Sequence, residues 1–534
     1  MFVMAEFIMT EMFSSQLVLL IVFLIGIGLF VSNKNKRPLP PGPRGLPILG
    51  NITDLPASGE REWEHWLKHK DVYGPISSVT ALGTTIIVLH SRALAVELLE
   101  KQSALNSSRT RLVFGGEMVG WGNTLPLLPY DDRFRASRKH VHLMIGTQSN
   151  IEPYNLLQDV EVHRFLFRVL QEPNNLLSHI RTEAGAIILK MIYGYTIEAH
   201  KPDPLVELAA TALDQFSAST VPGAWLVDVI PVLRYMPEWM PGTGFKSTAR
   251  EWRKKLRNVT ETPLRFTRKQ MSRGKYEKSF VADFCERAGE DLSPEDEYVL
   301  KWTALSLYGG GADTTVSTLR TFFLAMMLHP EVQLKAREEI DRVVGSSRLP
   351  TYDDRGRLPY IQAIVTEAWR WHPVAPMGVP HVASADYVFD GYCIPKGAII
   401  VQNIWWFMHD PAVYPNPSTF DPSRYLGSDP APDPRDDIFG YGRRICPGKY
   451  LAESTVWLTI ARSLAVFEIG KGLDDNNSEI EPSVSFSPGI ISHPGSFQAT
   501  IKPRSPRHEA LIRDVEILHP WEESSAGELE ISEL

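Results

Sequence analysis

One long helix constrains the fold of this chain more than any other feature of its sequence. Ser293 is a good capping residue, Pro294 suits a first helical turn, and Asp296 stands at the capping-box spacing. The helical pattern runs from there to Leu328 and ends at His329-Pro330. At 1.5 Å per residue, the sequence predicts a helix ~50 Å long.

Three consecutive glycines stand in the middle of this predicted helix, in the stretch YGGGADTT from Tyr308 to Thr315. A glycine inside a helix costs about 1 kcal/mol relative to alanine, so some contact must compensate. Either a second helix packs closely against the bare backbone, or a flat molecule lies on it. A phosphate-binding loop is disfavoured because no Gly-Lys-Ser/Thr sequence follows. Asp313 and Thr314 place an acid and a hydroxyl beside the same bare patch.

The rest of the chain is predicted to be mainly helical, with small β-sheets. Residues 76–90 are rich in β-branched side chains around Gly83, which favours a hairpin. No internal repeat, low-complexity tract or second linker interrupts residues 52–502, so one large domain is the economical interpretation. Amphipathic helices are predicted at 91–101, 131–145, 154–172, 178–193, 203–217 and 246–273.

The amino terminus predicts a membrane anchor within residues 1–33. Residues 12–31 carry no charge and are long enough to cross a ~30 Å hydrocarbon layer as a helix. A cleavable signal is disfavoured because no basic residue precedes the segment and no clear cleavage site follows it. Lysine and arginine follow the segment, which places the rest of the chain in the cytosol. A proline-rich hinge is expected at 34–51, and residues 503–534 form an acidic tail, peripheral or disordered.

Charge and cysteine content exclude some classes of protein. The net charge is −8 and the isoelectric point is near 6.0, which argues against nucleic acid as a partner. The three cysteines, Cys285, Cys393 and Cys446, are too few and too scattered for a disulfide framework or a zinc site. Reduced thiols in a cytosolic compartment are the natural interpretation.

Cys446 nevertheless lies in an unusual stretch, FGYGRRICPG from Phe439 to Gly448, where glycines and arginines surround the sulfur. Earlier, the predicted helix at 358–371 carries Glu367 and Arg370 at i, i+3 spacing within apolar flanks. A buried arginine needs a bidentate partner, so this is more than an ordinary surface pair.

Four motifs, in this order and at these separations, resemble the cytochrome P-450 family of haem-thiolate monooxygenases. The resemblance extends from the hinge to about residue 500, and its details are most similar to microsomal enzymes of fungal secondary metabolism. It implies the family fold, a triangular prism of helices around haem. The motifs are Gly310-Gly-Ala-Asp-Thr-Thr315, Glu367-Ala-Trp-Arg370, Phe420-Asp-Pro-Ser-Arg-Tyr425 and Phe439-Gly-Tyr-Gly-Arg-Arg-Ile-Cys-Pro-Gly448.

The resemblance implies a role for each motif residue. Cys446 is the expected axial iron ligand, and Gly442 and Gly448 let backbone amides approach its sulfur. Thr314 is expected to deliver protons, with Asp313 as the outer relay. The expected cofactor contacts are Arg444, Arg138, His381 and Arg109 on the haem propionates, together with Gly310, Gly311 and Phe439.

Two positions depart from the family pattern. Phe134 replaces a tryptophan whose ring nitrogen would donate to a propionate, which leaves that hydrogen bond in doubt. Tyr425 replaces the commoner phenylalanine, but Arg424 is kept, so the cluster of Glu367, Arg370 and Arg424 that braces the haem core should form.

The family also implies the chemistry. Haem b (iron protoporphyrin IX) would use dioxygen and electrons from NADPH to hydroxylate a lipophilic small molecule such as a terpenoid, polyketide or alkaloid. No dinucleotide motif or flavin-sized length remains, so a separate NADPH-cytochrome P-450 reductase must supply the electrons, with cytochrome b5 as a further candidate donor. The expected location is the endoplasmic reticulum membrane, single-pass, with the catalytic domain in the cytosol.

Two other functions stay open at this point. A haem-thiolate isomerase or dehydratase would need neither dioxygen nor reductase, and the presence of Asp313-Thr314 counts against it. A non-catalytic, membrane-anchored haem binder would also keep Cys446. Epoxidation, desaturation or ring rearrangement would require no change in the motifs.

Overall fold

The computed structural model describes residues 37–57, 59–221, 223–289 and 291–530. The predicted membrane segment at 12–31 lies outside these residues. Within them, no helix combines the length and apolarity that a membrane crossing requires. The proposed boundaries of anchor, hinge, domain and tail therefore stay a prediction.

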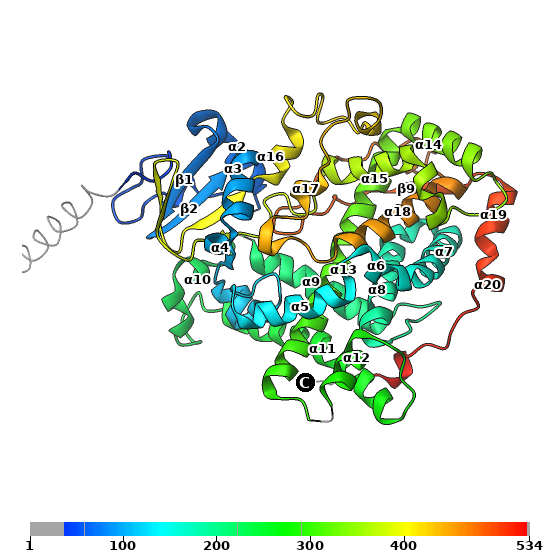
Figure 1. Cartoon of the computed structure of the whole chain (residues 1–534), viewed down its shortest axis with the longest axis horizontal. Coiled ribbons are helices and arrows are strands. Elements are labelled where there is room, and N and C mark those ends of the chain that lie inside the picture. Colours follow the sequence, from blue (N-terminus) through cyan, green and yellow to red (C-terminus); the bar gives the residue numbers. More distant parts are fainter. Residues whose placement is uncertain (1–36, 58, 222, 290, 531–534) are drawn as a thin grey trace, which may run out of the picture.

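The predicted long helix is confirmed as α13, Pro294–Leu328, and it runs through the middle of the molecule (Figure 1). The Ser293 side chain accepts a hydrogen bond from the Asp296 amide, as its capping spacing predicts. The carboxyl-terminal half of α13 is buried on all sides, including Phe322 and Leu324, which are fully enclosed. Helix α8 (Leu176–Tyr193) and helix α18 (Lys449–Val466) pack against it.

The other helical predictions also correspond to helices, with ends displaced by a few residues. Residues 91–101 form α3 (Arg92–Ala95) and a π-helical turn (Val96–Lys101). The remaining ones are α5 (Asp132–Ile145), α7 (Asn155–Gln171), α9 (Pro204–Thr220), α11 (Phe245–Ser272) and α15 (Pro359–Trp371). Helices outside those predictions include α2 (Glu62–Tyr73), α10 (Leu226–Val229), α12 (Phe280–Ala288), α14 (Pro330–Val343), α16 (Ile404–His409) and α17 (Arg435–Ile438).

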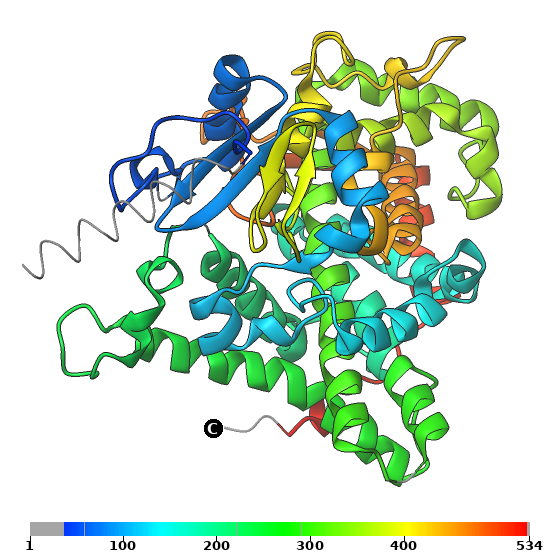
Figure 2. The ribbon, with the colours of Figure 1, turned by 60° about the vertical axis from the view of Figure 1, so that its left-hand side comes forward.

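The β-structure is small and lies to one side of the helices (Figure 2). The predicted hairpin is confirmed as β1 (Ile76–Ala81) and β2 (Thr84–Leu89), with Leu82 and Gly83 in the turn at positive φ. β2 pairs in parallel with β7 (Ile399–Gln402), and the sheet continues through β4 (His381–Val382) to β3 (Ser108–Arg109). Two further sheets pair β5 (Tyr387–Phe389) with β6 (Tyr392–Ile394) and β8 (Phe467–Lys471) with β9 (Ala499–Pro503).

The acidic carboxyl-terminal segment packs on the helical body, so the disordered alternative for this tail is wrong through residue 530. It forms α19 (Pro506–Arg513) and α20 (Val515–Leu518), both in contact with α7 (Figure 1). The acidic composition hid the apolar side chains of Ile512 and Val515, which are buried in this contact.

A buried ion cluster joins α15 to the loop at 419–425. Arg370 and Glu367 are both fully buried, and the guanidinium binds the carboxylate through two nitrogens at 2.7 and 2.8 Å. Arg424 donates to the same carboxylate at 3.2 Å, which confirms the predicted cluster. Tyr425 adds what its phenylalanine counterpart could not, because its hydroxyl donates to Glu367 Oε2 at 3.2 Å.

This cluster predicts a graded loss of stability. Glu367→Gln leaves two buried or nearly buried guanidinium groups without a carboxylate and should lower the free energy of unfolding by about 3–5 kcal/mol. Tyr425→Phe removes one hydrogen bond and should cost about 1–2 kcal/mol. Thermal unfolding of the two purified variants checks the order, and equal losses would contradict the assignment of Glu367 as the centre of the cluster.

Candidate functional site

The loop before α18 holds Cys446 in a fixed conformation. The Cys446 amide donates to the Phe439 carbonyl at 2.7 Å, which closes the loop on itself. Phe439 itself packs edge-on against Trp369 of α15, with ring centroids 5.5 Å apart. The loop is therefore fastened to the same helix that carries the buried Glu367 cluster.

Gly442 and Gly448 were predicted to permit this conformation, and only Gly442 is required sterically. Gly442 has φ +52°, and a Cβ there would stand 2.6 Å from the Leu99 carbonyl oxygen. A Cβ on Gly448 would lie 3.8 Å from Ile145 and 4.0 Å from the Cys446 sulfur, which are ordinary contacts. The contacts described thus do not themselves require glycine at 448, and the Gly448 amide approaches the sulfur as predicted.

The electrostatic surroundings of the sulfur act in two directions. Burial raises the pKa of the Cys446 thiol, whereas the Gly448 amide, Arg138 and Lys449 lower it. The cysteine also lies three residues before the first residue of α18, and the free amides at this end of a helix favour an anion. These groups therefore favour the thiolate form of Cys446 against the effect of burial, and a metal cation bound to the sulfur would stabilise the thiolate further.

Two explanations were open for the glycines of α13, close packing of a second helix or a flat molecule on the bare backbone, and each explanation fits a different glycine. A Cβ on Gly311 would stand 2.4 Å from Ile188 of α8, so this glycine permits close helix packing. A Cβ on Gly310 would meet nothing within 4 Å, and Gly310 is exposed although it lies mid-helix. Gly310 therefore fits the predicted open face, while the bare side of Gly311 is taken up by α8 rather than a cofactor.

The acid and the hydroxyl that follow these glycines are not bonded to each other. The Thr314 hydroxyl donates to the Gly310 carbonyl at 2.7 Å. The Asp313 carboxylate instead pairs with His493 Nε2 at 3.1 Å. His493 comes from the loop before β9 and was not predicted, because only the tertiary fold brings a residue 180 positions away onto α13.

Three arginines with no acidic partner gather beside the cysteine loop. Among the residues that the structure describes, no carboxylate forms an ion pair with Arg109, Arg138 or Arg444, whose side chains bind backbone carbonyls instead. Arg444 donates to Ser107, Leu125 and Leu128, Arg109 to Pro126, Val379 and Pro380, and Arg138 to Ile445.

Mutual repulsion and burial show in the pKa values of these groups. Burial and the nearby Arg138 lower the pKa of Arg444 to about 10. Burial and Arg444 hold the pKa of Arg109 well below its usual range. Such uncompensated positive charge is costly in the interior and favours an anionic ligand.

His381 and Phe134 complete this cluster. His381 lies directly opposite Arg109 in the β3–β4 ladder and donates from Nδ1 to the Asn106 carbonyl at 2.7 Å. Burial, Arg109 and Arg444 hold the pKa of His381 well below its usual value, so the ring is neutral. Phe134 lies 3.7 Å beneath the Arg444 guanidinium, and this cation–π contact occupies the position of the family tryptophan.

These residues fit the haem that the sequence resemblance implies. Haem carries two carboxylates, which can pair with the arginines that have no acidic partner in the protein. Its iron takes a thiolate ligand, which Cys446 can supply, and Gly310 leaves room for its flat ring. Arg109, Arg138 and Arg444 would hold the carboxylates. The fit to haem is argued from the Cys446 sulfur as iron ligand and from the positive charge of the three arginines, which no carboxylate of the described residues balances.

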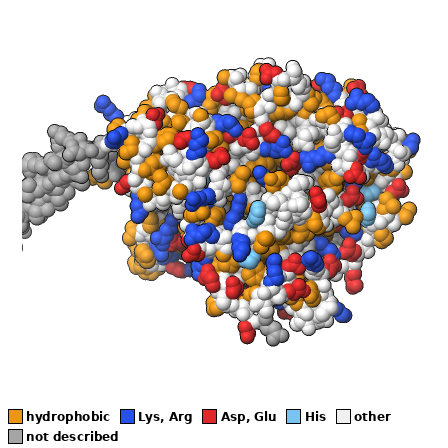
Figure 3. Space-filling model, viewed as in Figure 1, with side chains coloured by type: hydrophobic (Ala, Val, Ile, Leu, Met, Phe, Trp, Pro, Cys, Tyr) orange, Lys and Arg blue, Asp and Glu red, His pale blue; other side chains and the backbone are white. Residues whose placement is uncertain are grey.

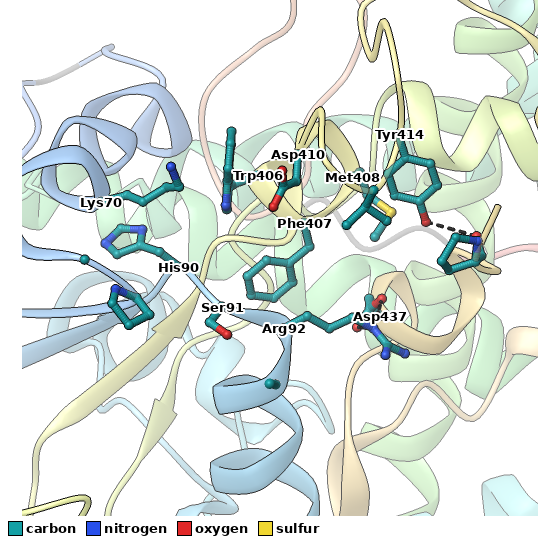
Figure 4. Close-up of a pocket in the computed structure, with 15 residues that line it drawn as sticks. Lys70, His90, Ser91, Arg92, Trp406, Phe407, Met408, Asp410, Tyr414 and Asp437 are labelled. Carbon is teal, nitrogen blue, oxygen red and sulfur yellow. Dashed lines mark hydrogen bonds and ion pairs between the residues drawn. The ribbon is translucent and has the colours of Figure 1, made fainter.

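A separate cavity of about 620 Å³ lies at the surface between α2, α3 and α16 (Figure 4). Lys70, His90 and Trp406 are among its lining residues, and Lys70 Nζ stands 4.2 Å from the centre of the Trp406 ring. None of the predicted site residues lines it.

The two loop glycines predict different effects of the same substitution. Gly442→Ala forces an alanine into left-handed backbone against a carbonyl and should destabilise the protein by about 2 kcal/mol or more. Gly448→Ala, the matched control, should change the thermal unfolding midpoint little. A stable Gly442→Ala variant would contradict the conformation described for the cysteine loop.

Comparison with known proteins places the chain in a family. The cytochrome P450 family model matches residues 40–500. Cytochrome P450 monooxygenase claR of Ampulloclitocybe clavipes is 48% identical, covering 96% of this chain and 95% of the relative. Cytochrome P450 monooxygenase CLM2 of Gibberella zeae is 46% identical, covering 96% and 99%. O-methylsterigmatocystin oxidoreductase of Aspergillus flavus is 40% identical, covering 94% and 96%. The chain therefore belongs to the cytochrome P450 family, as a monooxygenase that depends on a haem iron.

Proposed function

We propose that this monooxygenase hydroxylates a lipophilic small molecule, using dioxygen and electrons that a separate NADPH-cytochrome P-450 reductase delivers. The observation that carries the proposal is the paired arrangement of Cys446 and α13. Cys446 stands before α18 with an amide on its sulfur, and α18 packs on α13, whose Gly310 is open.

The substrate is a fungal secondary metabolite such as a terpenoid or polyketide. A relative with 40% identity is an oxidoreductase named for O-methylsterigmatocystin, and the three relatives named above come from fungi. By their position in the family, four segments are expected to line the substrate pocket, residues 114–121, 305–309, 375–379 and 489–492. They are chiefly apolar, which suits a lipophilic ligand.

Bound haem b would supply the oxidation itself, by activating dioxygen at its iron. The chain's residues prepare the place for that chemistry. Cys446 offers its thiolate to the iron, and Arg109, Arg138, Arg444 and His381 surround the two carboxylates. The Thr314 hydroxyl would donate the proton that the reaction consumes, and Asp313, which does not contact it directly, would be the outer group that resupplies it.

Attachment to the endoplasmic reticulum membrane, with the catalytic domain in the cytosol, is part of the proposal. Large apolar side chains are exposed in two separate segments of the chain, with Ile48 at 95% in the first and Trp239 at 81% in the second. Hydrophobic atoms are visible on the surface beside the point where the described chain begins (Figure 3). The chain that leads into the second segment passes close to the chain that follows the first, since a Cβ on Gly223 would lie 3.9 Å from the Pro56 carbonyl oxygen. Both segments would meet one membrane surface together with the predicted anchor.

Thiolate ligation can be tested by spectroscopy. Microsomes that contain the reduced protein should give, on adding carbon monoxide, the red-shifted Soret band after which the family is named. Cys446→Ser should abolish the band because a hydroxyl does not replace the thiolate. Folded wild-type protein without any haem spectrum would refute the proposal.

The proton relay predicts the behaviour of Thr314→Ala. Without the hydroxyl, proton delivery fails and reduced oxygen leaves as peroxide, so product formed per NADPH should fall about tenfold or more. Product, NADPH and peroxide are measured together with added reductase. Unchanged coupling would remove Thr314 from the relay, and product formation without NADPH would favour the isomerase alternative.

A further inference from the structure

The surface cavity between α2, α3 and α16 is separate from the proposed haem site and has the size of a small-molecule site. Its volume of about 620 Å³ lies within the range that such sites occupy. In Figure 4 the Phe407 ring stands in the middle of the cavity, with Tyr414 on one side and with Lys70, His90 and Ser91 on the other. The groups at these two ends indicate what kind of molecule the cavity would bind.

Three polar groups at the Lys70 end have weak partners or none. The Lys70 ammonium pairs with Asp71 at 3.4 Å, but the Asp71 side chain is 72% exposed, and such exposed pairs contribute little. The Ser91 hydroxyl forms no capping hydrogen bond with α3. His90 is 3% exposed, and its Nδ1 has no hydrogen-bond partner among the described residues. This end can therefore receive the polar group of a ligand without giving up strong contacts.

Lys70 supplies the positive charge of this end, because His90 is neutral. Burial lowers the pKa of His90 to about 4, and its Nε2 shares a hydrogen bond with the Ser77 hydroxyl at 3.1 Å. The Lys70 ammonium is held at the cavity wall by the Trp406 ring, whose centre lies 4.2 Å from Nζ. An ammonium beside a hydroxyl and an imidazole nitrogen favours an anionic group, with which it forms strong hydrogen bonds.

The two carboxylates of the lining differ in how far their charge is balanced. Asp437 accepts hydrogen bonds from Arg92 Nε, at 2.9 and 2.8 Å to its two oxygens, and from the Tyr441 hydroxyl at 2.8 Å. Asp410 accepts the Ala412 amide at 3.0 Å in the turn after α16. Within the described part of the chain, Asp410 has no cationic partner, so it would repel an anion and attract a cation.

The middle of the cavity is apolar and aromatic. Trp406, Phe407 and Met408 follow one another on α16, and the last two are almost completely buried. Flat rings pack well against aromatic and thioether side chains. An aromatic body that carries one carboxylate therefore matches both the apolar middle and the Lys70 end.

The opposite wall of the cavity is part of the support of the cysteine loop. In Figure 4, Arg92 extends from α3 to Asp437, which lies on α17. The Asp437 carbonyl accepts the Gly440 amide at 2.9 Å, and its carboxylate binds Tyr441, which is buried within the loop. A ligand that packs between α3 and α16 would therefore also restrain the loop that carries Cys446.

We propose that this cavity is an effector site for a small aromatic carboxylate, and that the bound molecule stabilises the cysteine loop. The carboxylate would bind at Lys70 and Ser91, and the ring would pack on Trp406 and Phe407. Because the native protein has this site and the unfolded chain does not, binding adds stability by mass action. The inference depends on neither the substrate nor the reductase.

The first test is a calorimetric titration of the haem-loaded protein with naphthoate as the probe. Naphthoate should bind saturably at millimolar concentration or below. The neutral amide of the same shape, naphthamide, should bind about tenfold more weakly or worse, because it lacks the charge that Lys70 recognises. Failure of naphthoate to bind, or equal binding of the amide, would contradict the inference.

Variants then locate the bound probe. Lys70→Met keeps most of the apolar stem and should weaken naphthoate binding about tenfold, whereas Asp410→Asn removes a like charge and should strengthen it a few-fold. The matched control is Lys68→Met, an exposed lysine of the same helix that does not line the cavity. It should bind naphthoate as the wild type does. Equal losses in the two lysine variants, no loss in either, or weaker binding by Asp410→Asn would overturn the proposal.

The effect on the cysteine loop has a readout of its own. When the reduced protein with bound carbon monoxide is warmed, the red-shifted Soret band disappears as the thiolate is lost. Saturating naphthoate should raise the temperature of this loss by a few degrees in the wild type and leave it unchanged in Lys70→Met. Binding of naphthoate without any rise in this temperature would refute the effector role.

Discussion

Uncompensated positive charge in the interior is the constraint on which the site depends. Arg109, Arg138 and Arg444 are held by backbone carbonyls, which satisfy their hydrogen-bond donors but leave their charge in place. The segments that supply those carbonyls are brought together by the β3–β4 ladder, the cysteine loop and the chain before α5. The fold therefore spends stability to assemble a cationic pocket, and a ligand with two carboxylates recovers that cost on binding.

A second buried ion cluster, which does contain a carboxylate, lies on α15, the helix against which the cysteine loop packs. Glu367 accepts hydrogen bonds from Arg370, Arg424 and Tyr425, so the loop at 419–425 is held to α15. Phe439 packs on the same helix and closes the cysteine loop through its carbonyl. Rigid support of this kind allows one sulfur to be positioned by many weak contacts distributed over the core.

Local sequence predicted much of this structure, because helix caps, periodicity and motifs are local properties. The limits of α13, the hairpin at Gly83 and the Glu367 cluster follow from neighbouring residues or from motif order. The sequence does not predict which of the three glycines is packed against another helix and which is open. Gly309 faces Leu213 and Gly311 faces Ile188, whereas Gly310 faces open space, and these positions depend on the tertiary fold. The same holds for the His493–Asp313 pair and for the packing of the carboxyl-terminal segment, which join residues far apart in the chain.

The carboxyl-terminal segment has a consequence for how the protein is made. Trp521 lies 4.8 Å from the buried Arg164 guanidinium, and the Pro520 carbonyl accepts a hydrogen bond from the same arginine. Glu522 and Glu530 form ion pairs with Lys190 and Lys269 on α8 and α11. These residues leave the ribosome after every element that they cover. The surface around Arg164 therefore stays uncovered until residues 520 and 521 have left the ribosome, so this part of the helical body closes later than the helices that it covers.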